Sequence, residues 1–419
     1  MNELALSCHD DVSERELRRF ITFSLLWFSL YNLLQKVLML PDSSWQMVTM
    51  VYGVVLLLAF VPSFLILLGR VPQTLIVSLL ALVIIYATSY LAFPESLSLL
   101  GRGLMWSGMA WCIAIATYGI VDYRALYRSL VHISYWIAAI ALIPIIHNFT
   151  SAQGDMTYDI GFSYAMALPT IIHLAEFART RKSLFLLLFL LECGMLLAVG
   201  VRGVFMCIAV AGLLLFFTSR IDFLSKFICT VLLIFVGGIC YFFKAEIGQG
   251  LYELFAAMGF ESRTLHMMAV SDTEGITLSR RSIIWGITWS LIKSRPLLGW
   301  GLGGGIMALD RGLTAYYDVS TYPHNLYLEM MLDFGIPIGL GLSLWLLFSP
   351  LKLKRLPAKW CEFRYLFIIF YAVGNVALWF SSQYFRTYAF FVFVALLLRL
   401  RHLIRQWENS PTTATSSKI

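Results

Sequence analysis

The chain has 419 residues, of which 59% are apolar and only 13% are Asp, Glu, Lys or Arg, and its mean hydropathy is +0.79. A soluble globular protein carries about 25% charged residues, so this composition excludes a soluble or disordered chain and predicts a polytopic membrane protein. The net charge of +7 comes from short basic clusters between apolar runs, which is typical of cytoplasmic loops and not of a nucleic-acid interface.

Twelve apolar stretches are long enough to be transmembrane helices, which need about 20 mostly apolar residues. They are residues 20–40, 46–69, 74–93, 103–121, 129–147, 160–178, 183–200, 203–219, 224–243, 325–349, 363–381 and 387–402. Residues 183–219 would be too long for one span, so a break is predicted at Gly200–Gly203. We therefore expect an all-α fold, with about 12 transmembrane helices in one integral-membrane domain over residues 1–419.

The basic residues predict that both termini lie in the cytoplasm. With the N-terminus inside, most of the 31 Lys and Arg residues fall in inner segments, as the positive-inside rule requires. Residues 1–19 and 403–419 are then cytoplasmic tails. The first tail lacks the small-residue cleavage site of a signal peptide, so we expect it to be retained.

The longest segment between predicted spans, residues 244–324, is expected on the outer side, before the tenth span. Amphipathic stretches alternate there with the glycine-rich run GWGLGGG. A loop of this length without secondary structure would be unusual, so short helices against the membrane face are predicted. The seven cysteines are scattered and form no CxxC pair, which predicts neither a disulfide framework nor a structural zinc site.

Four arginines on the predicted outer side are candidates for anion binding. Arg202 lies in a short turn between two apolar helices, where a charge is costly and often functional, although snorkelling or a carboxylate partner would also explain it. Arg280 and Arg281 begin the helix-like run RRSIIWGITW, which is equally compatible with a solvated helix face. Arg386, in the last outer turn, is the weakest candidate, because snorkelling to the interface explains it better.

His324 and Asn325 lie where the long loop enters the tenth span. A neutral histidine at a membrane surface can accept a proton from a hydroxyl group; the alternative is a capping residue at the interface. Glu192, midway along its predicted span, has no evident partner in the sequence. Buried pairing or protonation is expected of such a carboxyl group, and its role stays open.

Motifs for other chemistries are absent from the sequence. It contains neither HExxH nor GxSxG, and GWGLGGG follows no strand and precedes no lysine–serine pair. It also lacks the closely spaced outer aspartates that would hold a divalent cation. We therefore expect no metal and no cofactor.

A segment of about 60 residues, 281–340, resembles the signature region of bacterial O-antigen ligases and O-antigen polymerases. In that family an arginine precedes a tryptophan by four residues, a Pro-Leu-Leu-Gly-x-Gly turn follows, and nine residues separate a His-Asn pair from a Gly-x-Pro segment. The matching residues are Arg281 and Trp285, Pro296 to Gly301, His324 and Asn325, and Gly335 and Pro337. Arg202 is similar to a second arginine of the family. The spacing of Gly335 and Gly339 is one residue wider than the Gly-x-x-Gly that ligases often have.

The resemblance implies a metal-independent, membrane-embedded glycosyltransferase of the GT-C type in the bacterial inner membrane, with its active site facing the periplasm. The donor would be a glycan on undecaprenyl pyrophosphate. A ligase transfers that glycan to a sugar hydroxyl of lipid A–core in lipopolysaccharide biosynthesis, whereas a polymerase transfers it to the next repeat unit. Of these two activities, we favour the ligase.

The resemblance also assigns roles to the candidate residues. Arg281 and Arg202 would bind the pyrophosphate, because an arginine fork matches its oxygens and stabilises the charge on the leaving group. His324 would be the general base. Further substrate-binding residues would be Arg280, Asn325 and Arg386.

Two other functional classes remain open beside this reading. A lipid-linked glycan flippase would also bind pyrophosphate, but it should carry basic residues deep within several spans, whereas the candidates gather at one face. A non-catalytic scaffold would leave that gathering unexplained. We therefore predict that Arg202, Arg281 and His324 converge at one outer-facing cavity.

Overall fold

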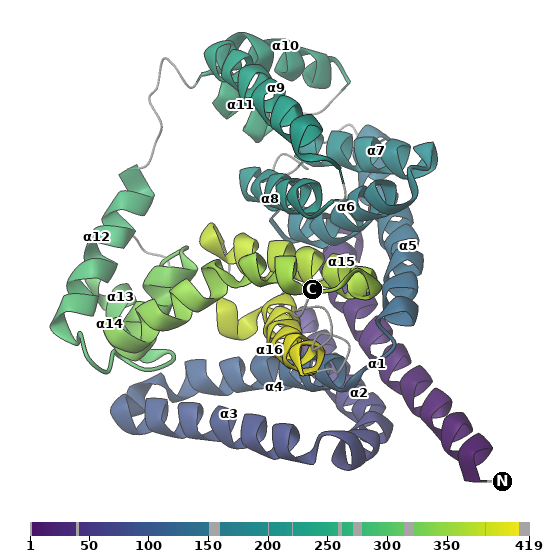
Figure 1. The fold of residues 1–419 in the computed structure, drawn as a ribbon. Coiled ribbons are helices and arrows are strands. Elements are labelled where there is room, and N and C mark those ends of the chain that lie inside the picture. The colour runs from purple at the N-terminus through teal and green to yellow at the C-terminus, as the bar shows by residue number, and fades with distance from the viewer. Residues whose placement is uncertain are drawn as a thin grey trace. The chain divides into compact units, whose positions relative to one another are not determined.

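The protein is described by a computed structural model that covers residues 2–38, 42–150, 160–199, 201–219, 221–258, 262–270, 279–313, 322–381 and 383–409. All regular secondary structure in these ranges is helical (Figure 1). The chain forms two compact units. The first comprises Met1–Ser24, Gln46–Tyr127 and Ser279–Ile419, and the second comprises Leu25–Trp45 and Arg128–Leu278.

Five long helices make up the chain as far as residue 150. They are α1 (Asn2–Leu38), α2 (Asp42–Arg70), α3 (Pro72–Ala92), α4 (Leu97–Gly119) and α5 (Tyr123–Thr150). Local sequence explains two of the boundaries. Pro72 occupies the first turn of α3, where its missing N–H costs no helical bond. The Asp122 carboxylate accepts a hydrogen bond from the N–H of Ala125 at 2.9 Å and so caps α5.

Shorter helices follow in the second unit. They are α6 (Ile160–Thr180), α7 (Ser183–Val199), α8 (Arg202–Thr218), α9 (Phe223–Phe242), α10 (Lys244–Ala257) and α11 (Arg263–Ala269). Because α7 ends at Val199 and α8 begins at Arg202, the predicted break at Gly200–Gly203 is confirmed. Helix α6 packs against both α7 and α8.

The C-terminal part of the chain returns to the first unit. Its helices are α12 (Ser279–Ser294), α13 (Gly304–Leu313), α14 (Leu326–Leu347), α15 (Cys361–Phe370) and α16 (Tyr388–Glu408). A π-helix, Tyr371–Val376, continues α15, and 3-10 turns cover Pro94–Ser96, Ser349–Arg355, Ala358–Trp360, Ala377–Trp379 and Tyr384–Arg386. Helix α16 packs against α4, α15 and the π-helix, with the rings of Phe367 and Phe393 edge to face at 5.6 Å.

Seven helical stretches within the described residues are long and apolar enough to cross a membrane. They are Met47–Arg70, Pro72–Ala92, Pro94–Gly119, Tyr123–Ile146, Ile160–Thr180, Leu326–Leu347 and Ala358–Trp379, and α7 and α8 are shorter apolar helices. The all-helical, membrane-embedded fold class is therefore confirmed. The count of twelve spans, the sidedness and the outer position of residues 244–324, which contain α10 to α13, stay predictions.

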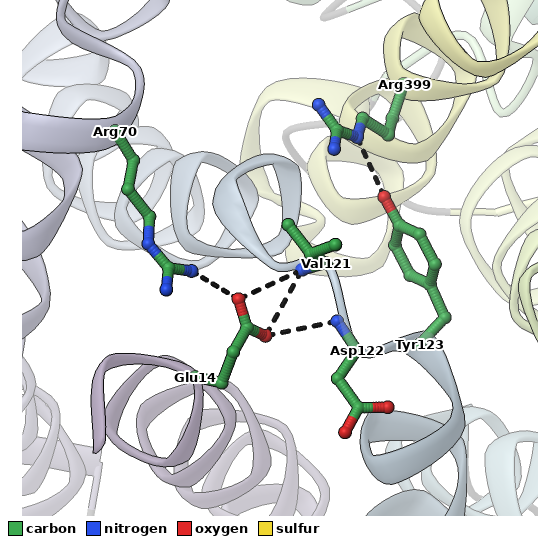
Figure 2. Close-up of polar contacts among 6 residues, drawn as sticks. All are labelled: Glu14, Arg70, Val121, Asp122, Tyr123 and Arg399. Carbon is green, nitrogen blue, oxygen red and sulfur yellow. Dashed lines mark hydrogen bonds and ion pairs between the residues drawn. The ribbon is translucent and has the colours of Figure 1, made fainter. Parts of the chain in front are cut away.

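Polar contacts join several helix ends in the first unit (Figure 2). Glu14 of α1 forms an ion pair with Arg70 at the end of α2. Its carboxylate also accepts hydrogen bonds from the N–H groups of Val121 at 3.2 Å and Asp122 at 3.1 Å. These two amides precede α5, and a carboxylate at a helix N-terminus is favoured by the helix dipole. One carboxylate therefore connects α1, α2 and the start of α5.

Candidate active site

His324 and Asn325 immediately precede α14. The side-chain oxygen of Asn325 accepts hydrogen bonds from the N–H groups of Tyr327 at 3.0 Å and Leu328 at 3.1 Å. Asn325 is thus the N-cap of α14. Its side-chain amide nitrogen takes no part in these capping hydrogen bonds.

The backbone of His324 is in the left-handed region, with φ 52°. This conformation is uncommon for residues other than glycine, and such residues gather at functional sites. The half-buried imidazole packs against the ring of Tyr322, with the two ring centres 4.0 Å apart. The strained backbone and the aromatic contact hold the imidazole at the beginning of α14.

Helix α12 brings Arg281 to His324. Trp285, one helical turn after Arg281, donates a hydrogen bond from Nε1 to the carbonyl oxygen of Pro323 at 2.9 Å. The exposed Arg281 side chain reaches the carbonyl oxygen of Phe380 at 3.3 Å. Burial of the imidazole, followed by the positive charge of Arg281, lowers the pKa of His324 to about 4. The structure thus brings Arg281 and His324 together and keeps the imidazole neutral at pH 7.

Helix α14 is interrupted at Gly335, whose φ of 78° and ψ of 169° are not helical. Pro337 has no N–H and so cannot donate to the carbonyl of Asp333. The interruption therefore leaves three backbone groups without helical partners: the carbonyls of Leu332 and Asp333 and the N–H of Ile336.

The glycine-rich turn before α13 satisfies all three of these groups. The N–H of Trp300 donates to the Leu332 carbonyl at 2.8 Å, and the N–H of Gly301 donates to the Asp333 carbonyl at 2.9 Å. In return, Ile336 donates to the carbonyl of Pro296 at 2.7 Å. Buried backbone groups need hydrogen-bond partners, and the turn supplies those partners to the kink of α14.

Two glycines are required by this close approach. A Cβ at Gly299 would lie 2.5 Å from the Asp333 carbonyl oxygen, and a Cβ at Gly335 would lie 2.3 Å from that of Leu297. Gly299 and Gly335 also have positive φ values, 68° and 78°. The glycine-rich turn and the kink of α14 therefore fit together through their backbones, which explains why glycine occupies positions 299 and 335.

Two buried carboxylates that sequence reasoning missed lie further along α14. Glu329 and Asp333 are one helical turn apart and each is 2% exposed. Tyr384 donates from its hydroxyl group to Oδ2 of Asp333 at 2.8 Å, whereas Oε1 of Glu329 and Oδ1 of Asp333 have no hydrogen-bond partner within the described part of the chain. The sequence did contain a sign of this pair, because two carboxylates four residues apart in an apolar helix lie on the same face of that helix.

Arg386 lies close to this carboxylate pair. Burial and the nearby charge of Arg102 lower its pKa, and the negative charge of Glu329 opposes that shift. Among the described residues, no contact joins Arg386 to Arg281 or His324. Its assignment as a substrate-binding residue therefore stays a prediction, and so does that of Arg280, whose side chain is outside the described part of the chain.

Arg202 belongs to the second unit, where it is exposed at the first position of α8. The preceding turn is held by the N–H of Val201, which donates to the hydroxyl of Ser163 at 3.1 Å. Because Arg281 and His324 belong to the first unit, the convergence of all three residues stays a prediction.

The partner of Glu192 is His173, which the sequence did not reveal. The carboxylate lies 2.8 Å from Nδ1 of His173, and Nε2 of the same ring lies 3.0 Å from the hydroxyl oxygen of Ser134. All three residues are buried inside the second unit. Of the explanations considered for Glu192, buried pairing is confirmed.

The described residues contain no group of three or more His, Cys, Asp or Glu side chains that could hold a metal ion. No curated protein matches the chain. The O-antigen ligase family matches residues 184–346, from α7 to the end of α14, and so includes Arg202, Arg281, Trp285, His324 and Gly335. Residues 184–346 thus match an O-antigen ligase domain, which supports the resemblance of this part of the chain to the superfamily of O-antigen ligases and polymerases.

Proposed function

We propose that the protein is an O-antigen ligase of the bacterial inner membrane. It transfers a glycan from undecaprenyl pyrophosphate to a sugar hydroxyl of lipid A–core, at a site that faces the periplasm. The observation that carries this proposal is the proximity of the Arg281 guanidinium to the neutral imidazole of His324 within the matched domain. An anion-binding group beside a proton acceptor is what glycosyl transfer from a pyrophosphate needs.

Arg281 is assigned to the donor. A guanidinium carries five N–H donors, and one of them makes the long bond to Phe380. The remaining donors can bind two pyrophosphate oxygens at once and stabilise the charge that grows on the leaving group. Arg202 is proposed as the second arginine of this site, with Arg280 and Arg386 as further contacts to the donor.

His324 is assigned to the acceptor. The acceptor hydroxyl loses its proton to the imidazole as its oxygen bonds to the anomeric carbon. The bond between that carbon and the pyrophosphate oxygen breaks, and its electron pair leaves with undecaprenyl pyrophosphate. The negative charge of bound donor offsets the charge of Arg281, so the pKa of His324 rises and the base becomes stronger once donor is present. We assign to the amide nitrogen of Asn325 the role of orienting the acceptor.

The match to the superfamily supports a polymerase as well, since ligase and polymerase share this chemistry and differ in the acceptor hydroxyl. Purified protein in nanodiscs should therefore be given one lipid-linked glycan donor and, in separate reactions, lipid A–core or a second lipid-linked repeat unit. Transfer to lipid A–core identifies the ligase. Transfer only to the repeat unit would replace it by the polymerase, and no transfer to either would refute both.

Two variants test the assigned roles. We expect His324→Ala to lower the rate of transfer by a factor of about 10²–10⁴, the usual contribution of a positioned base, while donor binding is retained. Arg281→Lys keeps the charge but removes the planar fork, so donor binding and transfer should both fall, with transfer lower by a factor of about 10².

The matched controls are His132→Ala and Arg355→Lys, which change exposed residues outside this site and should transfer at the unmodified rate. Full activity of His324→Ala would exclude it as the base. All reactions contain a metal chelator, and loss of activity on its addition would contradict the metal-independent mechanism.

A further inference from the structure

A cavity of about 740 Å³ lies between α3, α4 and α16 in the first unit. Most of its wall is apolar and includes Val77, Leu82 and Ile85 of α3, Ile115 of α4, and Phe391 and Val394 of α16. Neither Asp nor Glu is among its lining residues. The cavity is partly open to the surroundings of the protein, and two of the helices that line it, α3 and α4, are apolar enough to cross a membrane.

One end of this groove is basic. Arg401, His402 and Arg405 of α16 line it there, beside Gln73 and Thr74 at the start of α3. The side chains of Arg401, His402 and Arg405 are exposed, and none of them forms an ion pair with a carboxylate within the described residues. The groove is therefore an apolar channel with a cationic mouth that no carboxylate among the described residues neutralises.

The surroundings of the mouth add to its positive charge. The guanidinium of Arg401 lies over the ring of Trp345, 5.3 Å from its centre, which fixes its position. The pKa of Lys352 is lowered by burial and by the charges of Arg401 and Arg355, so these cations lie close together. Basic side chains gathered at a membrane surface without acidic partners attract anionic headgroups.

The basic mouth lies at the end of α3 and α16 that is remote from the candidate active site. Ser89, near the other end of α3, accepts a hydrogen bond from the N–H of Leu302 in the glycine-rich turn, at 2.9 Å. Helix α16 likewise begins two residues after Arg386. From Gln73 to Ile85 the groove extends about 18 Å along α3, slightly more than one leaflet of a hydrocarbon core about 30 Å thick.

We propose that this groove binds an anionic phospholipid, with an acyl chain along α3 and α16 and its phosphate between Arg401 and Arg405. These arginines are four residues apart and so lie on one face of α16, where two guanidinium forks can share one phosphodiester. The pyrophosphate of a polyprenyl donor belongs at the opposite end, beside Arg281. The lipid is therefore a constituent of the other leaflet, and the inference does not depend on glycan transfer.

Lipid binding to the purified, delipidated full-length protein tests this proposal. Phosphatidylglycerol and phosphatidylcholine with identical dioleoyl chains should be titrated separately and the bound lipid measured by native mass spectrometry. We expect tighter binding of phosphatidylglycerol. The double variant Arg401→Gln, Arg405→Gln should reduce its affinity about 30-fold, the effect of two surface charges, and Arg405→Gln alone about 5-fold.

Two further variants separate the mouth from general surface charge and from the apolar channel. The double variant Arg181→Gln, Lys182→Gln also removes two exposed charges, but both residues belong to the second unit and neither lines the groove, so phosphatidylglycerol binding should be unchanged. Ala81→Trp places a large side chain in the channel and should weaken the binding of both lipids.

Three outcomes would overturn the proposal. The first is unchanged phosphatidylglycerol binding in the Arg401, Arg405 double variant. The second is an equal loss in the Arg181, Lys182 double variant, which would mean diffuse attraction to the surface. The third is displacement of bound phosphatidylglycerol by an equimolar amount of undecaprenyl phosphate, which would assign the groove to the polyprenyl carrier.

Discussion

Replacing Gly335 by alanine tests whether the glycine-rich turn supports the active site through backbone contacts. The new Cβ would lie 2.3 Å from the Leu297 carbonyl oxygen, which belongs to the backbone and cannot rotate away. The backbone at this residue, with φ 78° and ψ 169°, is nearly restricted to glycine and costs another residue about 1–3 kcal/mol.

The magnitude follows from these contacts. Relief of the clash requires the turn to move away from α14, which breaks the hydrogen bonds of Ile336 to Pro296 and of Gly301 to Asp333 at about 1 kcal/mol each. With backbone strain of about 2 kcal/mol, Gly335→Ala should lower the free energy of unfolding by about 4 kcal/mol. Transfer activity should fall as well, because the same helix begins next to His324.

The measurement is unfolding of the purified protein by SDS in mixed micelles, followed by tryptophan fluorescence, together with the transfer assay. Gly341→Ala is the matched control, since it lies in the same helix and its new Cβ would meet no atom within 4 Å. Its effect should stay below about 1 kcal/mol. If Gly335→Ala and Gly341→Ala unfold at the same SDS concentration, the turn does not support the kink in the way described.

Two further predictions concern titration and the ends of the helices. The pKa of His324 is lowered to about 4, so the imidazole is neutral above that pH. The pH dependence of kcat/KM reports the free protein, so its acid limb should lie near pH 4 and not near pH 6.5. The acid limb of kcat should lie at higher pH, because the negative charge of bound donor offsets the charge of Arg281 and raises the pKa of His324. Acid limbs of kcat and kcat/KM at the same pH would contradict this effect of the donor on His324. Glu14→Ala removes the carboxylate from the exposed N–H groups of Val121 and Asp122 and breaks the ion pair with Arg70, and it should cost about 2 kcal/mol. Its control, Glu16→Ala, removes only an exposed ion pair and should cost less than about 1 kcal/mol; equal losses would refute the capping role.

Much of the fold follows from apolar length alone. The described parts of eleven of the twelve predicted ranges lie mainly on one α-helix each, whereas residues 363–381 run through α15, a π-helix and a 3-10 turn. The break before Arg202 follows because a longer helix would not fit a bilayer. The proximity of Arg281 and His324 is one part of the predicted convergence, and the approach of Arg202 to them stays a prediction. These features depend on local composition and on residues separated by a short stretch of chain.

The remaining features depend on contacts that no local pattern encodes. Docking of the turn on α14 uses carbonyl and N–H groups, which every residue has, so the sequence does not reveal it. The need for glycine becomes clear only from the close backbone approach and the positive φ values in the structure. The partner of Asp333 is Tyr384, 51 residues later, and the partner of Glu192 is on another helix. A sequence shows that burying such carboxylates in an apolar helix costs free energy, but it does not show which side chain forms a hydrogen bond with them.

The buried carboxylates of α14 have a consequence for biogenesis. An aspartate near the middle of a translocating helix opposes its partition into lipid by about 2.5–3.5 kcal/mol, and Asp333 is accompanied by Glu329 one turn away. The hydroxyl group that receives Asp333 is synthesised 51 residues after it, when the whole of α14 has already been synthesised. Stable insertion of α14 should therefore wait for the segment that carries Tyr384, and nascent chains that end before that residue should leave α14 accessible from the aqueous side. Because of this order of synthesis, insertion of α14, the helix that follows His324, depends on the C-terminal segment that carries Tyr384.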